Sequence, residues 1–179
     1  THNFTVNQAP ISFTGSRQYD GSTNANNSDL TLSGLIDSQT LTLSGSGVIS
    51  SANVGSGKSV TLNTLSLADN SGLATNYTFT GGTHTLNVTK RILNSSGSKT
   101  YDANTNALAS AITLSNLASS ETLVDSGTAT IGSANAGSYT ISNLTGVSIA
   151  DGTNGGLASN YTLTGGTHNF TVNRRVIGV

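Results

Sequence analysis

The chain has 179 residues, of which only 8% are charged, and 7 basic residues stand against 8 acidic ones for a net charge of −1. Such a neutral chain lacks the basic surface that nucleic acid or an anionic membrane would require, and no run approaches the length of an apolar membrane span, so we expect neither nucleic-acid binding nor membrane insertion. The absence of cysteine excludes disulfides, thiol catalysis and zinc–thiolate sites.

Short strands are the predicted elements along the whole chain. Thr, Val, Ile and Tyr suit a pleated surface, whereas Ala, Glu, Lys and Arg are too sparse for long helices. In the first half, apolar residues alternate with Thr, Ser or Asn and so share one face of each strand. The alternating pairs are Ile11/Phe13, Leu30/Leu32, Leu41/Leu43, Val60/Leu62, Tyr77/Phe79 and Leu86/Val88. We expect six to eight short strands in this half, with hairpin-type turns at Asp20-Gly21 and Gly81-Gly82.

The second half of the chain repeats the first. Residues 1–7 and 167–173 both read THNFTVN, and residues 83–89 read THTLNVT. Tyr19 and Tyr101 lie 82 residues apart, and the offset becomes 84 after Asp69 and Asp151. Over residues 72–91 against 156–175, 13 of 20 positions are identical. The chain therefore holds two copies of one module.

The length of the repeat decides between repeat architectures. Solenoid coils repeat every 20 to 45 residues, whereas a unit of about 80 residues is long enough to fold independently as a sandwich domain. We predict the tail of a preceding repeat at 1–7, β modules at 8–90 and 91–174, and the start of a following repeat at 175–179. Each module is predicted to be an immunoglobulin-like β-sandwich; the alternative is a β-grasp-like module with one short helix near Asp69 or Asp151.

The predicted junction consists of Lys90 and Arg91. No Gly, Pro or Ser run separates the strand before it from the strand after it. So short a link cannot behave as a free coil. We therefore expect a monomeric, rod-like pair with a stiff joint, and both basic side chains exposed.

Short motifs carry a family resemblance over essentially the whole chain. They are Tyr19-Asp20-Gly21 with Tyr101-Asp102-Ala103, the ANVG and ANAG segments at 52–55 and 134–137, GLATNYTFT and GLASNYTLT, and the closing THTLNVTKR and THNFTVNRR. The chain resembles the YDG and MBG-type repeats of very large bacterial surface proteins, typically two-partner-secreted or filamentous-haemagglutinin-like adhesins. This resemblance implies an extracellular stalk on the bacterial cell surface, whose partners are the neighbouring repeats of the same chain. Because the second copy carries Ala103, the glycine of the triplet is not expected to be essential.

We expect no catalytic, cofactor or metal site. Residues 52–59, ANVGSGKS, fit a relaxed phosphate-loop pattern, but a strand-like alternation follows where such a loop needs a helix. His2, His84 and His168 occur once per copy, so we interpret them as exposed strand positions rather than metal ligands. Glu121 is the only glutamate and has no counterpart in the first copy, which disfavours an enzyme.

The remaining candidate residues are assigned structural roles. Asp20 and Asp102 are expected to accept hydrogen bonds from nearby backbone amides, and Asp69 and Asp151 are placed to cap a helical turn. No clustered acidic loop of the kind that binds calcium occurs.

The tyrosines leave two functions open. We expect Tyr77 and Tyr161 to bury their rings while their hydroxyls bind backbone at a strand corner. A sugar-stacking platform is the alternative use of these aromatic residues. The chain is accordingly predicted to be a non-enzymatic stalk, with a module that binds glycan or a host surface protein as the alternative.

Overall fold

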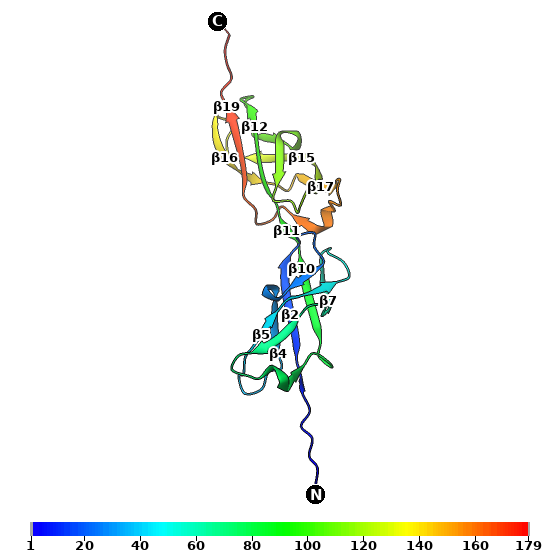
Figure 1. The fold of residues 1–179 in the computed structure, drawn as a ribbon. Coiled ribbons are helices and arrows are strands. Elements are labelled where there is room, and N and C mark those ends of the chain that lie inside the picture. Colours follow the sequence, from blue (N-terminus) through cyan, green and yellow to red (C-terminus); the bar gives the residue numbers. More distant parts are fainter. Residues whose placement is uncertain (1, 179) are drawn as a thin grey trace. The chain divides into compact units, whose positions relative to one another are not determined.

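Strands and single turns of 3-10 helix make up both halves of the chain in the computed structural model, which describes residues 2–178 (Figure 1). Its contacts divide the chain into two compact units, with the boundary between Thr89 and Lys90. The predicted all-β class is confirmed. In place of the short helix of the β-grasp alternative, the described residues contain only 3-10 turns of three residues each.

The first unit consists of short strands, as predicted, but its described residues form ten of them where six to eight were expected, because several are only two to four residues long. Its strands are β1 (Ala9–Pro10), β2 (Ser12–Gln18), β3 (Asn24–Asn26), β4 (Leu30–Ser33), β5 (Leu41–Ser44), β6 (Ser46–Ile49), β7 (Gly55–Thr61), β8 (Ser66–Asp69), β9 (Tyr77–Thr78) and β10 (His84–Thr89). Its 3-10 turns are η1 (Asn27–Asp29) and η2 (Ala74–Asn76).

The second unit repeats this order with one difference. Its strands are β11 (Arg91–Ile92), β12 (Asn94–Thr100), β13 (Asn106–Leu108), β14 (Ile112–Ser115), β15 (Leu123–Ile131), β16 (Gly137–Asn143), β17 (Val147–Asp151), β18 (Tyr161–Thr162) and β19 (His168–Asn173), with η3 (Ala109–Ala111) and η4 (Ala158–Asn160). The single long strand β15 replaces β5 and β6, although Gly45 between those strands and the equivalent Gly127 within β15 both have a positive φ, 83° and 95°.

Each unit has a mixed sheet with a parallel pair among its interior strands. The strand orders are β3-β6-β7-β10-β2-β4 and β13-β15-β16-β19-β12-β14. In both, the first long strand pairs in parallel with the last, β2 with β10 and β12 with β19. The remaining pairs in these sheets are antiparallel. Smaller two-stranded sheets, β1-β9 and β5-β8 in the first unit and β11-β18 in the second, complete the framework.

Both hairpins predicted for the first unit are wrong. Gly81-Gly82 joins β9 to β10, but β9 pairs with β1 whereas β10 pairs with β2 and β7. Asp20-Gly21 lies between β2 and β3, which also have different partners. The glycines do mark turns, but each turn carries the chain to a different partner strand.

The alternating apolar residues form the core as predicted. In the first unit, Ile11, Phe13, Leu86 and Val88 are all at most 2% exposed. In the second, Phe170 and Val172 pack with Ile112, Ile131 and Ile141 in one buried cluster.

The predicted junction is short in the structure as well. β10 ends at Thr89 and β11 begins at Arg91, so Lys90 alone lies between them. Lys90 is exposed, but Arg91 is half-buried, contrary to the expectation that both would be exposed. The Arg91 guanidinium binds Asn116 of its own unit, with Nε at 2.6 Å from the backbone oxygen and Nη2 at 2.8 Å from Oδ1. The stiffness of the joint stays a prediction.

Candidate functional site

The Tyr-Asp loops, defined as residues 19–24 and 101–106, follow the ends of β2 and β12 and each surround a basic side chain. In the second unit this side chain is Lys99. Its Nζ donates to the Asn104 backbone oxygen at 2.8 Å, to Asn104 Oδ1 at 2.9 Å and to the Asn106 backbone oxygen at 2.7 Å. Asp102 Oδ1 lies 2.9 Å from the same ammonium group. Four oxygens therefore surround the charge.

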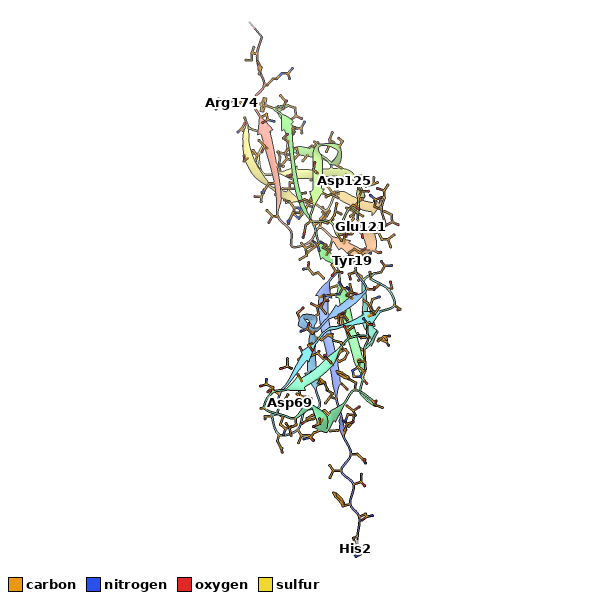
Figure 2. All side chains as sticks on the ribbon, in the orientation of Figure 1. His2, Tyr19, Asp69, Glu121, Asp125 and Arg174 are labelled. Atoms are coloured by element: carbon orange, nitrogen blue, oxygen red, sulfur yellow. The ribbon has the colours of Figure 1, made fainter. Side chains whose placement is uncertain are left out.

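Arg17 has the same place in the first unit. Its side chain is 6% exposed, donates to the Ser22 backbone oxygen and pairs with Asp20. Asp20 and Asp102 also accept from backbone amides two residues on, from Ser22 at 2.8 Å and from Asn104 at 3.2 Å. Figure 2 shows Tyr19, which opens the first of these loops. The predicted turn role of the two acids is confirmed, and their pairing with a cation is an additional finding.

Charge and backbone geometry both favour these loops. The hydrogen bond from Lys99 lowers the pKa of Asp102 below its ordinary value. Gly21 has a φ of 78° and Ala103 a φ of 64°, so both copies need a left-handed residue at the third position of the triplet. Glycine adopts this conformation at little cost, whereas alanine costs about 1 kcal/mol. The structure thus gives the glycine a backbone role that Ala103 fulfils at a cost.

A buried-tyrosine cluster lies at the other end of β2. Tyr77 is 4% exposed, its hydroxyl accepts from the Ile36 backbone amide at 3.2 Å, and it donates to Gln39 Oε1 at 2.5 Å. This is the predicted arrangement, a buried ring whose hydroxyl binds backbone. The buried ring is not available as a sugar-stacking platform.

The second unit has a charged version of this cluster. Tyr161 accepts from the Ala118 backbone amide at 3.0 Å and donates to Glu121 Oε2 at 2.6 Å. Burial, followed by the hydrogen bond to Glu121, raises the pKa of Tyr161 to about 12. Glu121 (Figure 2) is 9% exposed. Gln39 is its counterpart at the offset of 82, so the expectation that Glu121 has no counterpart overlooked an isosteric amide.

The Gly-Gly turns pack closely on the opening segments of the units. Gly81 and Gly165 have φ values of 84° and 87°, where glycine is favoured. A Cβ on Gly82 would collide with the Ile11 backbone oxygen, and one on Gly166 with the Leu93 backbone oxygen. The two glycines of each pair therefore have different tasks, one to turn the chain and one to allow close approach.

Histidines fix these turns from inside. His84 Nε2 lies 3.0 Å from the Phe79 backbone oxygen, and its ring stacks on Phe13 with centroids 4.4 Å apart. His168 Nε2 lies 2.8 Å from the Leu163 backbone oxygen, and its Nδ1 lies 2.9 Å from Ser95 Oγ.

The predicted exposure holds only for His2. His168 is 7% exposed and His84 is half-buried, so the prediction is wrong for these two. The physical reason is that they begin the closing strands, where each ring fills the space under the turn.

Two further motifs are structural. The Ala74 amide donates to Asp69 Oδ1 at 2.7 Å and the Ala158 amide to Asp151 Oδ1 at 2.8 Å, so both acids cap the 3-10 turns as predicted. Residues 52–59 form the loop between β6 and β7 and the first part of β7, with no helix after them. This agrees with the rejection of a phosphate loop.

Nothing in the described chain gathers groups for metal binding. Residues 2–178 contain no cluster of three or more His, Asp or Glu side chains suited to a metal ion. The oxygen-lined loops already hold the chain's own Arg17 or Lys99.

A surface pocket of ≈ 360 Å³ lies beside the first buried-tyrosine cluster, lined by Gln8, Ile36, Gln39 and their neighbours.

Two pairs of residues in these sites were not predicted from the sequence. Arg17 and Lys99 occupy equivalent positions at the offset of 82, three residues before the acid of each triplet. Gln39 and Glu121 show the same offset. Aligning the two copies for chemical similarity as well as identity would have found both pairs.

Comparison with known families decides the assignment. The model of the YDG domain matches residues 3–86 and again residues 82–168. The chain belongs to the YDG domain family. No curated protein and no solved structure matches it. Among residues 2–178, the YDG pair contains no helix with the length and apolar character needed to cross a membrane.

Proposed function

We propose that the two YDG domains are non-enzymatic spacer repeats in the stalk of an extracellular bacterial adhesin. One observation carries the proposal. In each unit the first and last long strands run parallel, so the chain enters at one end of the unit and leaves at the opposite end. This path suits a spacer, because a connection that arrives at one end of a unit continues from the other.

The chemistry of the features that recur in both copies supports the same role. The features shared by the two copies, namely the Tyr-Asp loops, the buried tyrosines and the Gly-Gly turns, all satisfy groups of the chain itself. Their polar atoms are used for folding and leave no constellation of nucleophile, base and orienting acid. A single residue between β10 and β11 agrees with repeats joined without a flexible linker.

The alternative is a binding module for glycan or a host surface protein. The observation that favours it is the ≈ 360 Å³ pocket beside Tyr77, whose walls include the amides of Gln8, Gln39 and Asn76. Pockets of this size accept small ligands.

A glycan array and a cell-binding assay with the 179-residue chain separate the two proposals. A spacer should show no saturable binding. Saturable, selective binding that Gln39→Ala abolishes and the exposed-loop variant Asn53→Ala retains would establish the binding module instead. In the parent adhesin, exchange of the pair for unrelated β domains of equal length should preserve adhesion if the spacer role is correct.

A further inference from the structure

We infer that each YDG domain is built to bear tension, through a mechanical clamp formed by its opening and closing segments. The clamp consists of residues 9–19 against 77–89 in the first unit and 91–101 against 161–173 in the second. This clamp would serve the proposed spacer role, on which its biological purpose rests. The force needed to unfold each unit should depend on the direction in which the unit is pulled.

Parallel pairing joins the two segments of each clamp in two separate stretches. β2 and β10 are in register over six successive positions, from Phe13 with His84 to Gln18 with Thr89. β12 and β19 match over six positions as well, from Ser95 with His168 to Thr100 with Asn173. A second parallel patch, β1 with β9 and β11 with β18, extends each clamp toward the start of the unit.

Backbone hydrogen bonds between the segments recur at equivalent places in the two units. In the first unit the amides of Ile11, Phe13 and Tyr19 donate to the oxygens of Thr78, Thr83 and Thr89, at 2.9, 3.1 and 2.9 Å. In the second unit the amides of Leu93, Ser95 and Tyr101 donate to the oxygens of Thr162, Thr167 and Asn173, at 2.8, 3.0 and 2.9 Å. The arrangement is therefore a property of the module and is not confined to one copy.

The direction of the strands determines how they meet a load. Tension between the two ends of a unit pulls the opening strand toward its start and the closing strand toward its end. In a parallel pair these directions are opposite along the strand axis, so all the hydrogen bonds between the strands are loaded together. An antiparallel hairpin pulled at its two free ends would open one bond at a time.

The surroundings of the clamp add to its resistance. β2 and β10 lie inside their sheet, between β4 and β7, so neither clamp strand is a free edge. Ile11, Phe13, Leu86 and Val88 are fully buried and keep water from one face of the strands. The Gly-Gly turn lies against the opening segment, where Gly82 allows contact with the Ile11 backbone. Sliding the two strands past each other would break these contacts as well as the backbone hydrogen bonds between the strands.

Single-molecule force spectroscopy on the 179-residue chain tests the inference through pulling direction. The chain has no cysteine, so introduced thiols give unique attachment points. Thr100→Cys with Asn173→Cys places handles on two exposed, paired residues at the same end of the second clamp. Kept reduced and pulled through these points, the clamp is peeled from one end. Pulled through the chain termini, the same double variant is loaded in shear.

We expect the second unit to unfold at a force about threefold higher or more in shear than in peeling, at equal pulling speed, since forced unfolding reports the height of the barrier crossed. Gln18→Cys with Thr89→Cys repeats the comparison in the first unit. Equal forces in the two directions would overturn the clamp, even if the adhesion assays support a spacer. High directional resistance together with saturable ligand binding would keep the clamp and reject the spacer proposal.

Discussion

The Tyr161 hydroxyl donates a hydrogen bond to the Glu121 carboxylate across 2.6 Å, and both side chains are nearly excluded from solvent. The first unit makes the same contact between Tyr77 and the neutral amide of Gln39. One sequence thus contains a charged and an uncharged form of the same cluster, each a control for the other.

Removing the hydroxyl should cost more in the second unit than in the first. Tyr161→Phe removes one hydrogen-bond donor from a buried carboxylate, whereas Tyr77→Phe removes one from a neutral amide. We expect a loss of about 2–3 kcal/mol in the free energy of unfolding for Tyr161→Phe and about 1 kcal/mol for Tyr77→Phe. Chemical denaturation of each variant, followed by NMR signals from each unit, measures the two losses. Equal losses would show that the charge of Glu121 adds nothing.

The alkaline titration of Tyr161 depends on Glu121. Its pKa of about 12 in the folded chain exceeds the ordinary 10.0, chiefly because of burial and then because of the hydrogen bond to Glu121. A raised pKa contributes stability that is complete below pH 10.0 and is lost as the pH rises toward about 12. Glu121→Gln should lower this pKa while burial keeps it above 10.0.

Ultraviolet absorbance of tyrosinate, with Tyr161→Phe to identify the contribution of Tyr161, follows this titration. The loss of stability begins at the ordinary pKa of 10.0 in both proteins and ends at the folded pKa, so the second unit of the Glu121→Gln variant should lose less stability than that of the wild type between pH 10.0 and about 12. An unchanged pKa in Glu121→Gln would assign the whole shift to burial.

The alternation of apolar residues predicted the strands and the core, because apolar side chains on one face of a strand are buried whichever strands lie beside it. Ile11, Phe13, Leu86 and Val88 are buried as their spacing indicated. Alternation does not say which strand lies beside which, since backbone hydrogen bonds are the same for every sequence. The alternation pattern therefore could not predict the parallel pairing of β2 with β10, and the Gly81-Gly82 turn was wrongly interpreted as a hairpin.

Among the candidate residues too, the sequence predicted local roles but not contacts with residues elsewhere in the loop. The turn role of Asp20 follows from local geometry and was predicted from sequence. Arg17 was not assigned to the loop, because a lone basic residue on a strand is usually solvated. Only the recurrence of a basic residue as Lys99 in the second copy carries that information.

Gly166 should tolerate no side chain, because the turn that contains it lies against the Leu93 backbone oxygen. Gly166→Ala is expected to lower the free energy of unfolding of the second unit by about 3 kcal/mol, as the turn and the opening segment move apart. Gly132→Ala is the matched control, since a Cβ there meets nothing within 4 Å and should change stability by less than about 0.5 kcal/mol. Thermal unfolding of both variants compares the two sites. A loss at Gly132 as large as that at Gly166 would indicate a general effect of alanine in place of glycine.

The Lys99–Asp102 pair should make the second unit sensitive to acid. The hydrogen bond from Lys99 holds the pKa of Asp102 below 3.8, so its contribution to stability is complete above pH 3.8 and is lost as the pH falls through the lower, folded value. Asp102→Asn removes the titrating group, and its stability should therefore decline less steeply than that of the wild type below pH 3.8.

Unfolding of the second unit as a function of pH, with the Asp102 side-chain carboxyl resonance followed by NMR, checks both parts of this prediction. Lys99→Gln should move the Asp102 pKa toward 3.8 and reduce the acid-dependent contribution, because the hydrogen bonds from Asn104 then remain to lower the pKa. Lys99→Gln added to Asp102→Asn should change the pH dependence no further, since the titrating carboxyl is already gone. If Lys99→Gln leaves the Asp102 resonance titrating as in the wild type, the hydrogen bond from Lys99 is not what lowers the pKa of Asp102.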